Sequence, residues 1–152
     1  MVENLDSFFM RLAIEEAIKA RKKNEIPIGS IITFDKKIIS KGFNSSIQDN
    51  DPTAHAEINA IRNASRKIGN YRLTNHTLYT TLEPCPMCLG AIIHSRIQRV
   101  VFGAPDYKTG ACGSCFRMLN TDCFNHEPEI FGGIESKRCS SLLTNFFKLK
   151  RS

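Results

Sequence analysis

The chain has 152 residues, of which 41% are hydrophobic and 24% are charged, and this composition excludes a disordered or fibrous protein. Its 21 Lys and Arg residues outnumber its 15 Asp and Glu residues, giving a net charge of +6. That charge favours an anionic partner such as nucleic acid or a phosphorylated substrate, although an ordinary basic surface would give the same value.

The six cysteines raise the question of disulfides and therefore of cellular compartment. Charged residues such as Arg11, Glu15 and Glu16 interrupt the first 23 residues, so this stretch lacks the apolar core of a secretory signal. No apolar run approaches the roughly 18 residues of a membrane span. In a cytosolic protein, Cys-x-x-Cys is more often metal-binding or redox-active than cross-linked. We therefore expect a cytoplasmic protein without membrane contact.

Hydrophobic periodicity and turn residues predict nine elements of secondary structure. In chain order they are a helix at Leu5–Lys22, a hairpin of strands 28–34 and 38–43 around Asp35-Lys36-Lys37, a helix at 54–68, a strand at Thr77–Leu82, a helix at 84–94, a strand at 99–103, a strand at Glu129–Phe131 and a helix at 135–150. The polar segments 44–53 and 104–113 are predicted to be loops.

Strands that alternate with helices after an opening hairpin predict an α/β fold. We expect a mixed sheet of about five strands with helices on both faces. The sequence shows no repeat, low-complexity tract or linker, so residues 1–152 are expected to form a single domain.

Cys85 and Cys88 lie three residues apart at the start of a predicted helix, which places both sulfurs on one face. A helix N-terminus also favours the thiolate, the form that binds metal. Thioredoxin-like redox chemistry is the main alternative, because that motif also follows a strand and opens a helix. A redox role would give no function to two other residues that carry suitable chemistry, His55 and Glu57.

His55 also lies near the start of a predicted helix. Two strand-to-helix junctions of one parallel region place their helix N-termini at the same edge of a sheet, so His55 and the two cysteines can converge there. One imidazole and two thiolates form a zinc site with an open fourth position, as catalytic zinc requires. Glu57 follows two residues later, about 200° round a regular helix, so it reaches this site only if His55 precedes the first turn.

Cys112-Gly113-Ser114-Cys115 is a second Cys-x-x-Cys motif. Together with Cys85 and Cys88 it could close a structural site of four thiolates, although the separation exceeds the roughly 15–20 residues common in such sites. That arrangement would remove the open position and with it catalysis. Cys123 and Cys139 are expected to be solitary thiols in the core.

The sequence resembles the bacterial tRNA-specific adenosine deaminases, which convert the wobble adenosine of a tRNA anticodon to inosine. The resemblance extends over essentially the whole chain and carries the His-x-Glu and Pro-Cys-x-x-Cys signature of zinc deaminases. Its motifs are Asp51-Pro52-Thr53-Ala54-His55-Ala56-Glu57, Thr80-Thr81-Leu82-Glu83-Pro84-Cys85-Pro86-Met87-Cys88, His94-Ser95-Arg96-Ile97 and Val100-Val101-Phe102-Gly103-Ala104. The chain departs from the family at Cys115, where an apolar residue is more common.

The resemblance implies a cytidine deaminase-like three-layer α/β/α fold, a homodimer and one Zn²⁺ per subunit on His55, Cys85 and Cys88. It implies that Glu57 moves protons between a zinc-activated water and the adenine. It further implies that Asn44 hydrogen-bonds the purine and that the backbone at Ala56 and Cys85 lines the hydration site. The loop that carries Asp106 and Lys108 fits the substrate-side loop of the family.

An anticodon stem-loop suits such an enzyme, because its loop bases are unpaired and can be splayed out. Phe147 and Lys148, beside the basic Lys150 and Arg151, are the best candidates for contacts to that RNA, although a solvated helix end would have the same composition. Asp106 could accept a hydrogen bond from a ribose 2′-OH.

Two other functions remain open at this point. One is a deaminase of a free base or nucleotide, such as guanine, cytosine or dCMP, with the same zinc core. The other is a non-enzymatic module that binds RNA around a zinc closed by four cysteines.

Overall fold

The computed structural model describes residues 4–151, so the two ends of the expected 1–152 domain lie outside the described residues. The described elements are α1 (Leu5–Lys22), β1 (Gly29–Phe34), β2 (Lys37–Phe43), α2 (Ala56–Ile68), β3 (Thr77–Leu82), α3 (Pro86–His94), β4 (Arg99–Ala104), β5 (Glu129–Phe131) and α4 (Ser136–Arg151). Within this part of the chain, none of the helices is both long and apolar enough to cross a membrane.

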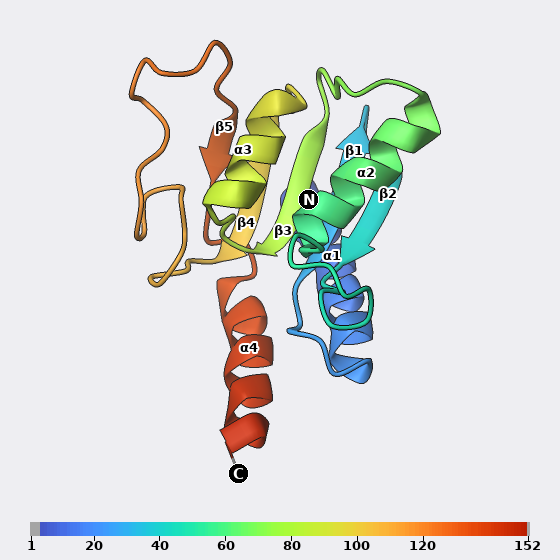
Figure 1. Cartoon of the computed structure of the whole chain (residues 1–152), viewed down its shortest axis with the longest axis vertical. Helices are drawn as coiled ribbons and strands as arrows, with labels where there is room; N and C mark the ends of the chain where they lie inside the picture. Colours follow the sequence, from blue (N-terminus) through green and yellow to red (C-terminus); the bar gives the residue numbers. More distant parts are fainter. Residues whose placement is uncertain (1–3, 152) are drawn as a thin grey trace.

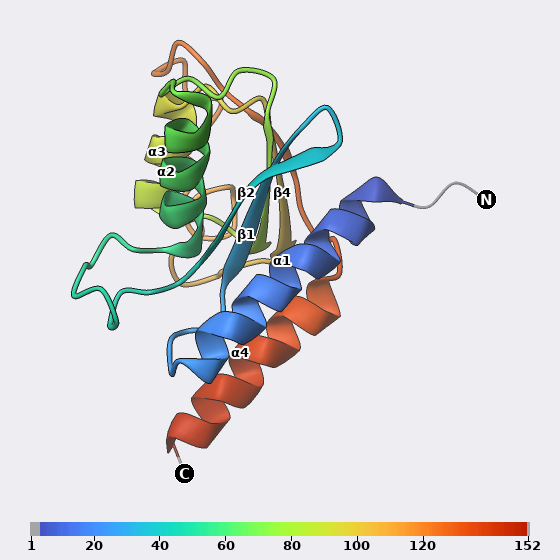
Figure 2. The same ribbon diagram turned by 90° about the vertical axis from the view of Figure 1, so that its right-hand side faces the viewer.

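The strands form one mixed sheet in the order β2-β1-β3-β4-β5. Strand β1 is antiparallel to both of its neighbours, whereas β3, β4 and β5 run parallel. Helices α2 and α3 cover one face of the sheet, and α1 and α4 cover the other (Figures 1 and 2). The predicted three-layer α/β/α fold with a mixed five-stranded sheet is therefore confirmed.

Each face of the sheet carries its own hydrophobic core, because successive side chains of a strand point to opposite faces. Leu78 and Val100 pack in the core beneath α2 and α3. Their chain neighbours Tyr79 and Val101 pack in the core beneath α1 and α4. This alternation explains why the central strands are apolar throughout, as in sheets covered on both faces.

Two helices that carry predicted site residues begin two residues later than predicted. His55 has an extended backbone (φ −74°, ψ 157°), so α2 begins at Ala56. Cys85 is also extended (φ −76°, ψ 173°), because a residue before proline avoids the helical region, and α3 begins at Pro86. His55 and Cys85 are thus N-cap residues rather than members of the first turn.

Strands β2 and β3 run in the same direction, since each is antiparallel to β1. The helices that follow them, α2 and α3, therefore begin at the same edge of the sheet (Figure 1). Gly42 of β2 allows α2 to lie directly on the strand, because a Cβ there would come within 2.5 Å of the Ala56 carbonyl oxygen and 2.6 Å of Ala60 N. This close packing fixes the position of His55 above the sheet.

The N-terminal helix is joined to the sheet by a charged contact. Both carboxylate oxygens of Asp6 accept hydrogen bonds from the Arg99 guanidinium, at 2.9 and 2.6 Å, and Oδ1 also accepts from the Tyr79 hydroxyl at 2.9 Å. The Arg99 hydrogen bonds hold the pKa of Asp6 below its usual value of 3.8.

We expect Asp6→Asn to lower the free energy of unfolding at pH 7 by about 1–2 kcal/mol, because hydrogen bonds to charged groups are lost. A carboxylate whose pKa is lowered by folding contributes stability that is present above the unfolded pKa and is lost as pH falls through the folded value. The difference between wild type and variant should therefore shrink below about pH 4. Urea unfolding at pH 7 and at pH 3 measures it, and a difference that grows at pH 3 would contradict the assignment.

Candidate metal centre and substrate pocket

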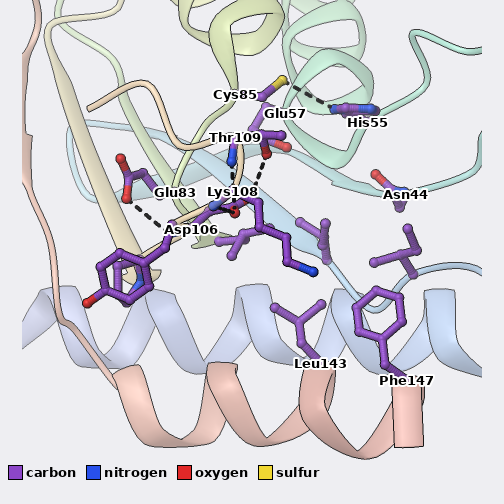
Figure 3. Close-up of a pocket in the computed structure, with 15 residues that line it drawn as sticks. Asn44, His55, Glu57, Glu83, Cys85, Asp106, Lys108, Thr109, Leu143 and Phe147 are labelled. Atoms are coloured by element: carbon purple, nitrogen blue, oxygen red, sulfur yellow. Dashed lines mark hydrogen bonds between the residues drawn. The ribbon is translucent and has the colours of Figure 1, made fainter. Parts of the chain in front are cut away.

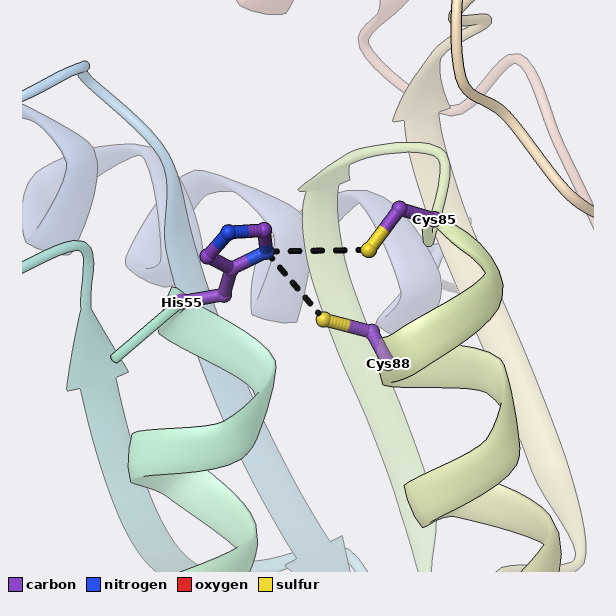
Figure 4. Close-up of side chains that lie close together, drawn as sticks. All are labelled: His55, Cys85 and Cys88. Carbon is purple, nitrogen blue, oxygen red and sulfur yellow. Dashed lines mark hydrogen bonds between the residues drawn. The ribbon is translucent and has the colours of Figure 1, made fainter. Parts of the chain in front are cut away.

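His55, Cys85 and Cys88 come together where α2 and α3 begin (Figure 4). The Nδ1 atom of His55 lies 3.7 Å from Cys85 Sγ and 3.5 Å from Cys88 Sγ. Within residues 4–151, these three side chains are the group of His, Cys, Asp and Glu residues whose ligand atoms lie close enough to share a metal ion. The convergence predicted from the two strand-to-helix junctions is confirmed.

The spacing of the three ligand atoms fits zinc. A tetrahedral site with Zn–S bonds of about 2.3 Å and Zn–N bonds of about 2.0–2.1 Å separates sulfur from nitrogen by about 3.5–3.6 Å. The two observed distances of 3.7 and 3.5 Å lie close to this value. Three ligands of this kind leave one coordination position for water, which is typical of catalytic zinc sites.

The protonation state of each of the three candidate ligands depends on the other two. A hydrogen bond from Cys88 and a second from His55 lower the pKa of Cys85 to about 4. The same contact with Cys85, together with burial, raises the pKa of Cys88. The hydrogen bond to Cys85 also raises the pKa of His55. Since zinc binds thiolates, we expect metal binding to release the proton of Cys88 and zinc affinity to increase with pH.

Glu57 lies beside these ligands. Because His55 is the N-cap of α2, Glu57 is the second residue of the helix, and its side chain lines the same pocket as His55 and Cys85 (Figure 3). Only 4% of Glu57 is exposed, and burial raises its pKa to about 7. A carboxyl with this pKa can both accept and return a proton near neutral pH.

The pocket has a volume of about 510 Å³, within the range of small-molecule sites. Seven of the residues predicted to act in the site line it, namely Asn44, His55, Glu57, Cys85, Asp106, Lys108 and Phe147. His55 and Cys85 form one wall, whereas Leu143 and Phe147 of α4 form the opposite wall (Figure 3). The site therefore lies between the two helical layers, at the edge of the sheet.

Two predicted substrate contacts do not line the pocket. Ala56 is fully buried, and its backbone N–H donates to Asn44 Oδ1 at 3.2 Å. This bond orients the Asn44 side chain, so its Nδ2 donor is the group left to meet a ligand. Lys148 is exposed on α4, one residue beyond Phe147, and not on the pocket wall.

Asp106 organises the turn that carries it. Its Oδ1 accepts the backbone N–H of Lys108 at 3.0 Å and of Thr109 at 3.1 Å, and its Oδ2 accepts the Thr109 hydroxyl at 2.7 Å. These are the local hydrogen bonds of an Asx-type turn. Asp106 thus has a structural role that the sequence did not indicate.

Glu83 is the most deeply buried carboxylate of the pocket, with 1% exposed, and sequence reasoning assigned no role to it. Its Oε1 accepts Asp106 N at 3.1 Å, and its Oε2 accepts Cys112 N at 2.9 Å and Ser114 N at 3.2 Å. It therefore joins the strand end before Cys85 to the loop on the substrate side. Its place directly before Pro84 and Cys85 is the one signal that could have identified it.

We expect Glu83→Ala to lower the free energy of unfolding by at least about 2–3 kcal/mol, because three backbone N–H groups lose a charged acceptor. Glu83→Gln keeps an acceptor oxygen and should recover part of the loss. Glu15→Ala, at an exposed position of α1, is the matched control and should have little effect. Urea unfolding of the three variants makes the comparison, and equal stabilities of Glu83→Ala and Glu15→Ala would contradict this role.

The second Cys-x-x-Cys motif is not part of the metal site. Among residues 4–151, neither Cys112 nor Cys115 belongs to the group that could hold a metal ion, so the site of four thiolates is not supported. Cys139 is buried, as predicted. The prediction for Cys123 was wrong: it is exposed in an irregular loop that no helix or strand covers, and its Sγ donates to the Thr121 carbonyl.

Comparison with known proteins is consistent with this geometry. Residues 3–104 match the family model of the cytidine and deoxycytidylate deaminase zinc-binding region. The chain is 52% identical over 147 residues to the tRNA-specific adenosine deaminase of Haemophilus influenzae, covering 96% of this chain and 85% of that protein. It is 48% identical over 151 residues to the enzyme of the same name from Buchnera aphidicola subsp. Schizaphis graminum, covering 99% of both chains.

Solved structures show the same relationship. A structure from a study of A-to-I editing by tRNA:A34 deaminases at the wobble position matches with a TM-score of 0.88 and 39% identity, over 90% of this chain and 99% of that chain. A guanine deaminase from Bacillus subtilis matches with a TM-score of 0.63 and 42% identity, over 64% of this chain and 63% of that chain. A guanine deaminase from Nitrosomonas europaea, at 23% identity and with a TM-score of 0.78 over 92% of this chain and 83% of that chain, shares the fold.

Proposed function

The chain belongs to the family of tRNA-specific adenosine deaminases, and on this premise we propose that it converts the wobble adenosine of a tRNA anticodon to inosine. The reaction consumes one water, replaces the 6-amino group of adenine with oxygen and releases ammonia. The observation that carries the proposal is the buried carboxyl of Glu57 beside the His55, Cys85 and Cys88 ligand set, within one pocket.

His55, Cys85 and Cys88 would hold the zinc. When bound, zinc lowers the pKa of a water in its open position to about 7 and so provides the nucleophile at neutral pH. Glu57 accepts the proton of the attacking water and delivers it to N1 of the adenine as C6 becomes tetrahedral. Glu57 then takes the remaining proton from the new hydroxyl group on C6 and passes it to the amino group, which leaves as ammonia while the C6 carbonyl forms. Its buried position next to the ligands keeps bulk water from competing for this proton.

The remaining pocket residues would bind the nucleotide. Asn44, oriented by Ala56 N–H, offers its Nδ2 to a ring nitrogen of the purine. The half-exposed ring of Phe147 offers an apolar face opposite the metal ligands. Lys108 in the pocket and Lys148 just outside it provide positive charge for phosphates. Asp106 keeps lone pairs for a ribose 2′-OH, and unchanged preference for RNA over DNA in Asp106→Asn would argue against that contact.

The setting of the reaction is part of the proposal. We place the enzyme in the cytoplasm, where its tRNA substrate would be met, and we propose a homodimer on the basis of the family resemblance. Sedimentation distinguishes the two assembly states of this 17.1 kDa chain, because a dimer has twice that mass.

The test is a comparison of substrates with purified, zinc-loaded protein. Ammonia release and inosine formation are followed with an anticodon stem-loop that carries adenosine at the wobble position. The same stem-loop with guanosine there is the control, and guanine, cytidine and dCMP are tested separately. We expect turnover of the adenosine stem-loop alone. Faster release from any of the small molecules would make the protein a free base or nucleotide deaminase with the same zinc core.

A further inference from the structure

The turn at residues 106–109 is held rigidly against the metal site. Asp106 N donates to Glu83 Oε1, and on the other side of the turn Ala111 N donates to the Pro84 carbonyl at 2.8 Å. Gly110 allows this approach, since a Cβ there would lie 2.4 Å from the Asp106 carbonyl oxygen and 2.5 Å from the Glu83 carboxyl carbon. The turn therefore stands at a fixed distance from the strand end that leads into Cys85.

Tyr107 occupies the tip of this turn. Its backbone is enclosed by the hydrogen bonds that Asp106 accepts from Lys108 and Thr109, yet 75% of the residue is exposed. Tyr107 nevertheless lines the pocket. The lining of the pocket thus includes two aromatic residues, Tyr107 on this turn and Phe147 on α4. Tyr71, which is 65% exposed, lies on none of the pocket walls and contacts Arg72 instead.

An exposed aromatic ring on a rigid turn is suited to stacking on a nucleobase, because little conformational entropy is lost on binding. When a loop nucleotide is turned out of its stack, its neighbours lose a stacking partner, and this loss is part of the cost of base flipping. A ring at the mouth of the pocket can replace that partner. This argument rests on the proposed function, since it assumes that the pocket holds an extruded adenosine of an RNA loop.

We propose that Tyr107 is a substrate-binding residue whose ring stacks on a base directly adjacent to the target adenosine. It acts on binding of the RNA loop rather than on the chemical step, because the interaction is the same in the ground state and the transition state. It thereby makes deamination depend on the presence of a neighbouring base, which distinguishes a loop from an isolated nucleoside.

The test uses steady-state kinetics of zinc-loaded Tyr107→Ala on the adenosine stem-loop. We expect KM to increase by about 5- to 150-fold, the range for loss of one base–aromatic stack, with kcat within about twofold of wild type. Tyr107→Phe retains the ring and should behave like wild type. Tyr71→Ala removes a comparably exposed ring outside the pocket and should leave both constants unchanged.

Stem-loops with an abasic nucleotide on the 5′ or the 3′ side of the target identify the stacked base. With the stem-loop that lacks the stacked base, the KM of the wild type should rise to the value that Tyr107→Ala has on the intact stem-loop. The KM of Tyr107→Ala should increase little further on that abasic substrate. An unchanged KM for Tyr107→Ala on the intact stem-loop, or an equal effect of the variant on both abasic substrates, would overturn the inference while leaving the proposed function in place. Absence of deamination by the wild-type protein would instead overturn the proposed function.

Discussion

Glu57→Ala is expected to bind zinc like the wild type and to lose about two to four orders of magnitude in kcat, or more. The reason for the loss is that Glu57 is the buried carboxyl beside the ligand set, with a pKa raised by burial to about 7. Zinc should be retained because the imidazole and the two sulfurs that we propose as its ligands, whose positions depend on the starts of α2 and α3, are unchanged. Metal analysis and single-turnover deamination of the stem-loop measure the two effects separately.

Glu57→Gln provides the stricter comparison, because it keeps the size and a hydrogen-bonding oxygen but cannot take up a proton at neutral pH. It should be as inactive as Glu57→Ala. Glu15→Ala, which removes an exposed carboxylate far along the chain, should be fully active. Near-normal turnover by Glu57→Gln would show that another group moves the proton, whereas loss of zinc from both variants would show that the carboxyl holds the metal.

Cys88→Ala is expected to reduce bound zinc from one ion per chain to a small fraction and to abolish deamination. Its sulfur lies 3.5 Å from His55 Nδ1 and is buried, so no other thiol of the described residues is placed to replace it. Removing a buried sulfur also leaves a cavity. Deleting one heavy atom from a core typically lowers the free energy of unfolding by about 1–2 kcal/mol. Thermal unfolding in the presence and absence of zinc separates the two contributions.

The paired replacement of Cys112 and Cys115 by serine is the matched control. It removes two sulfur atoms, one more than Cys88→Ala does, from the second Cys-x-x-Cys motif and should leave the zinc content at one ion per chain. Zinc loss in that double variant, with retention in Cys88→Ala, would reverse the assignment of the ligands.

Much of the fold could be predicted because its elements have clear periodicity. Strand β3 and helix α1 have the predicted bounds. A continuous apolar strand and an amphipathic helix differ in the spacing of their hydrophobic residues, so each could be recognised in the sequence. Helix starts were less predictable because they depend on single backbone angles. Glu135, for example, was expected to open the last helix, but its φ of 55° is left-handed and α4 begins one residue later.

The candidate metal ligands could be proposed from the sequence, since one imidazole and two thiols leave one position of a zinc site open, but a redox motif and a site of four thiolates stayed open as alternatives. Among the described residues, the structure brings His55, Cys85 and Cys88 together without Cys112 or Cys115. The sequence left the access of Glu57 to the site undecided. The extended backbone of His55 resolves it, because it places that residue before the first turn and lets Glu57 face the pocket.

The hydrogen-bonding roles of two supporting carboxylates, Glu25 and Glu83, could not be predicted from the sequence. Glu25 accepts the backbone N–H groups of Ile47 and Gln48, at 3.2 and 2.7 Å, and so holds the loop that leads to His55. Glu83 does the same for the loop opposite. A buried glutamate and a solvated one are identical in a sequence, and only the surrounding N–H donors distinguish them.

The proposed metal ligands lie at the starts of α2 and α3, two helices that share a hydrophobic core through residues such as Ala60 and Ala64 of α2 and Leu89 and Ile92 of α3. An ion held by ligands from the starts of both helices would link α2 to α3. If a change in the packing between these helices alters the affinity for the ion, ion binding alters the stability of that packing by the same free energy. We therefore expect that deleting a methyl group from this shared core, away from the two sulfurs, lowers the zinc content that remains after dialysis against a chelator. The apolar packing between the two helices would therefore contribute to the affinity for the ion, although none of these side chains touches it.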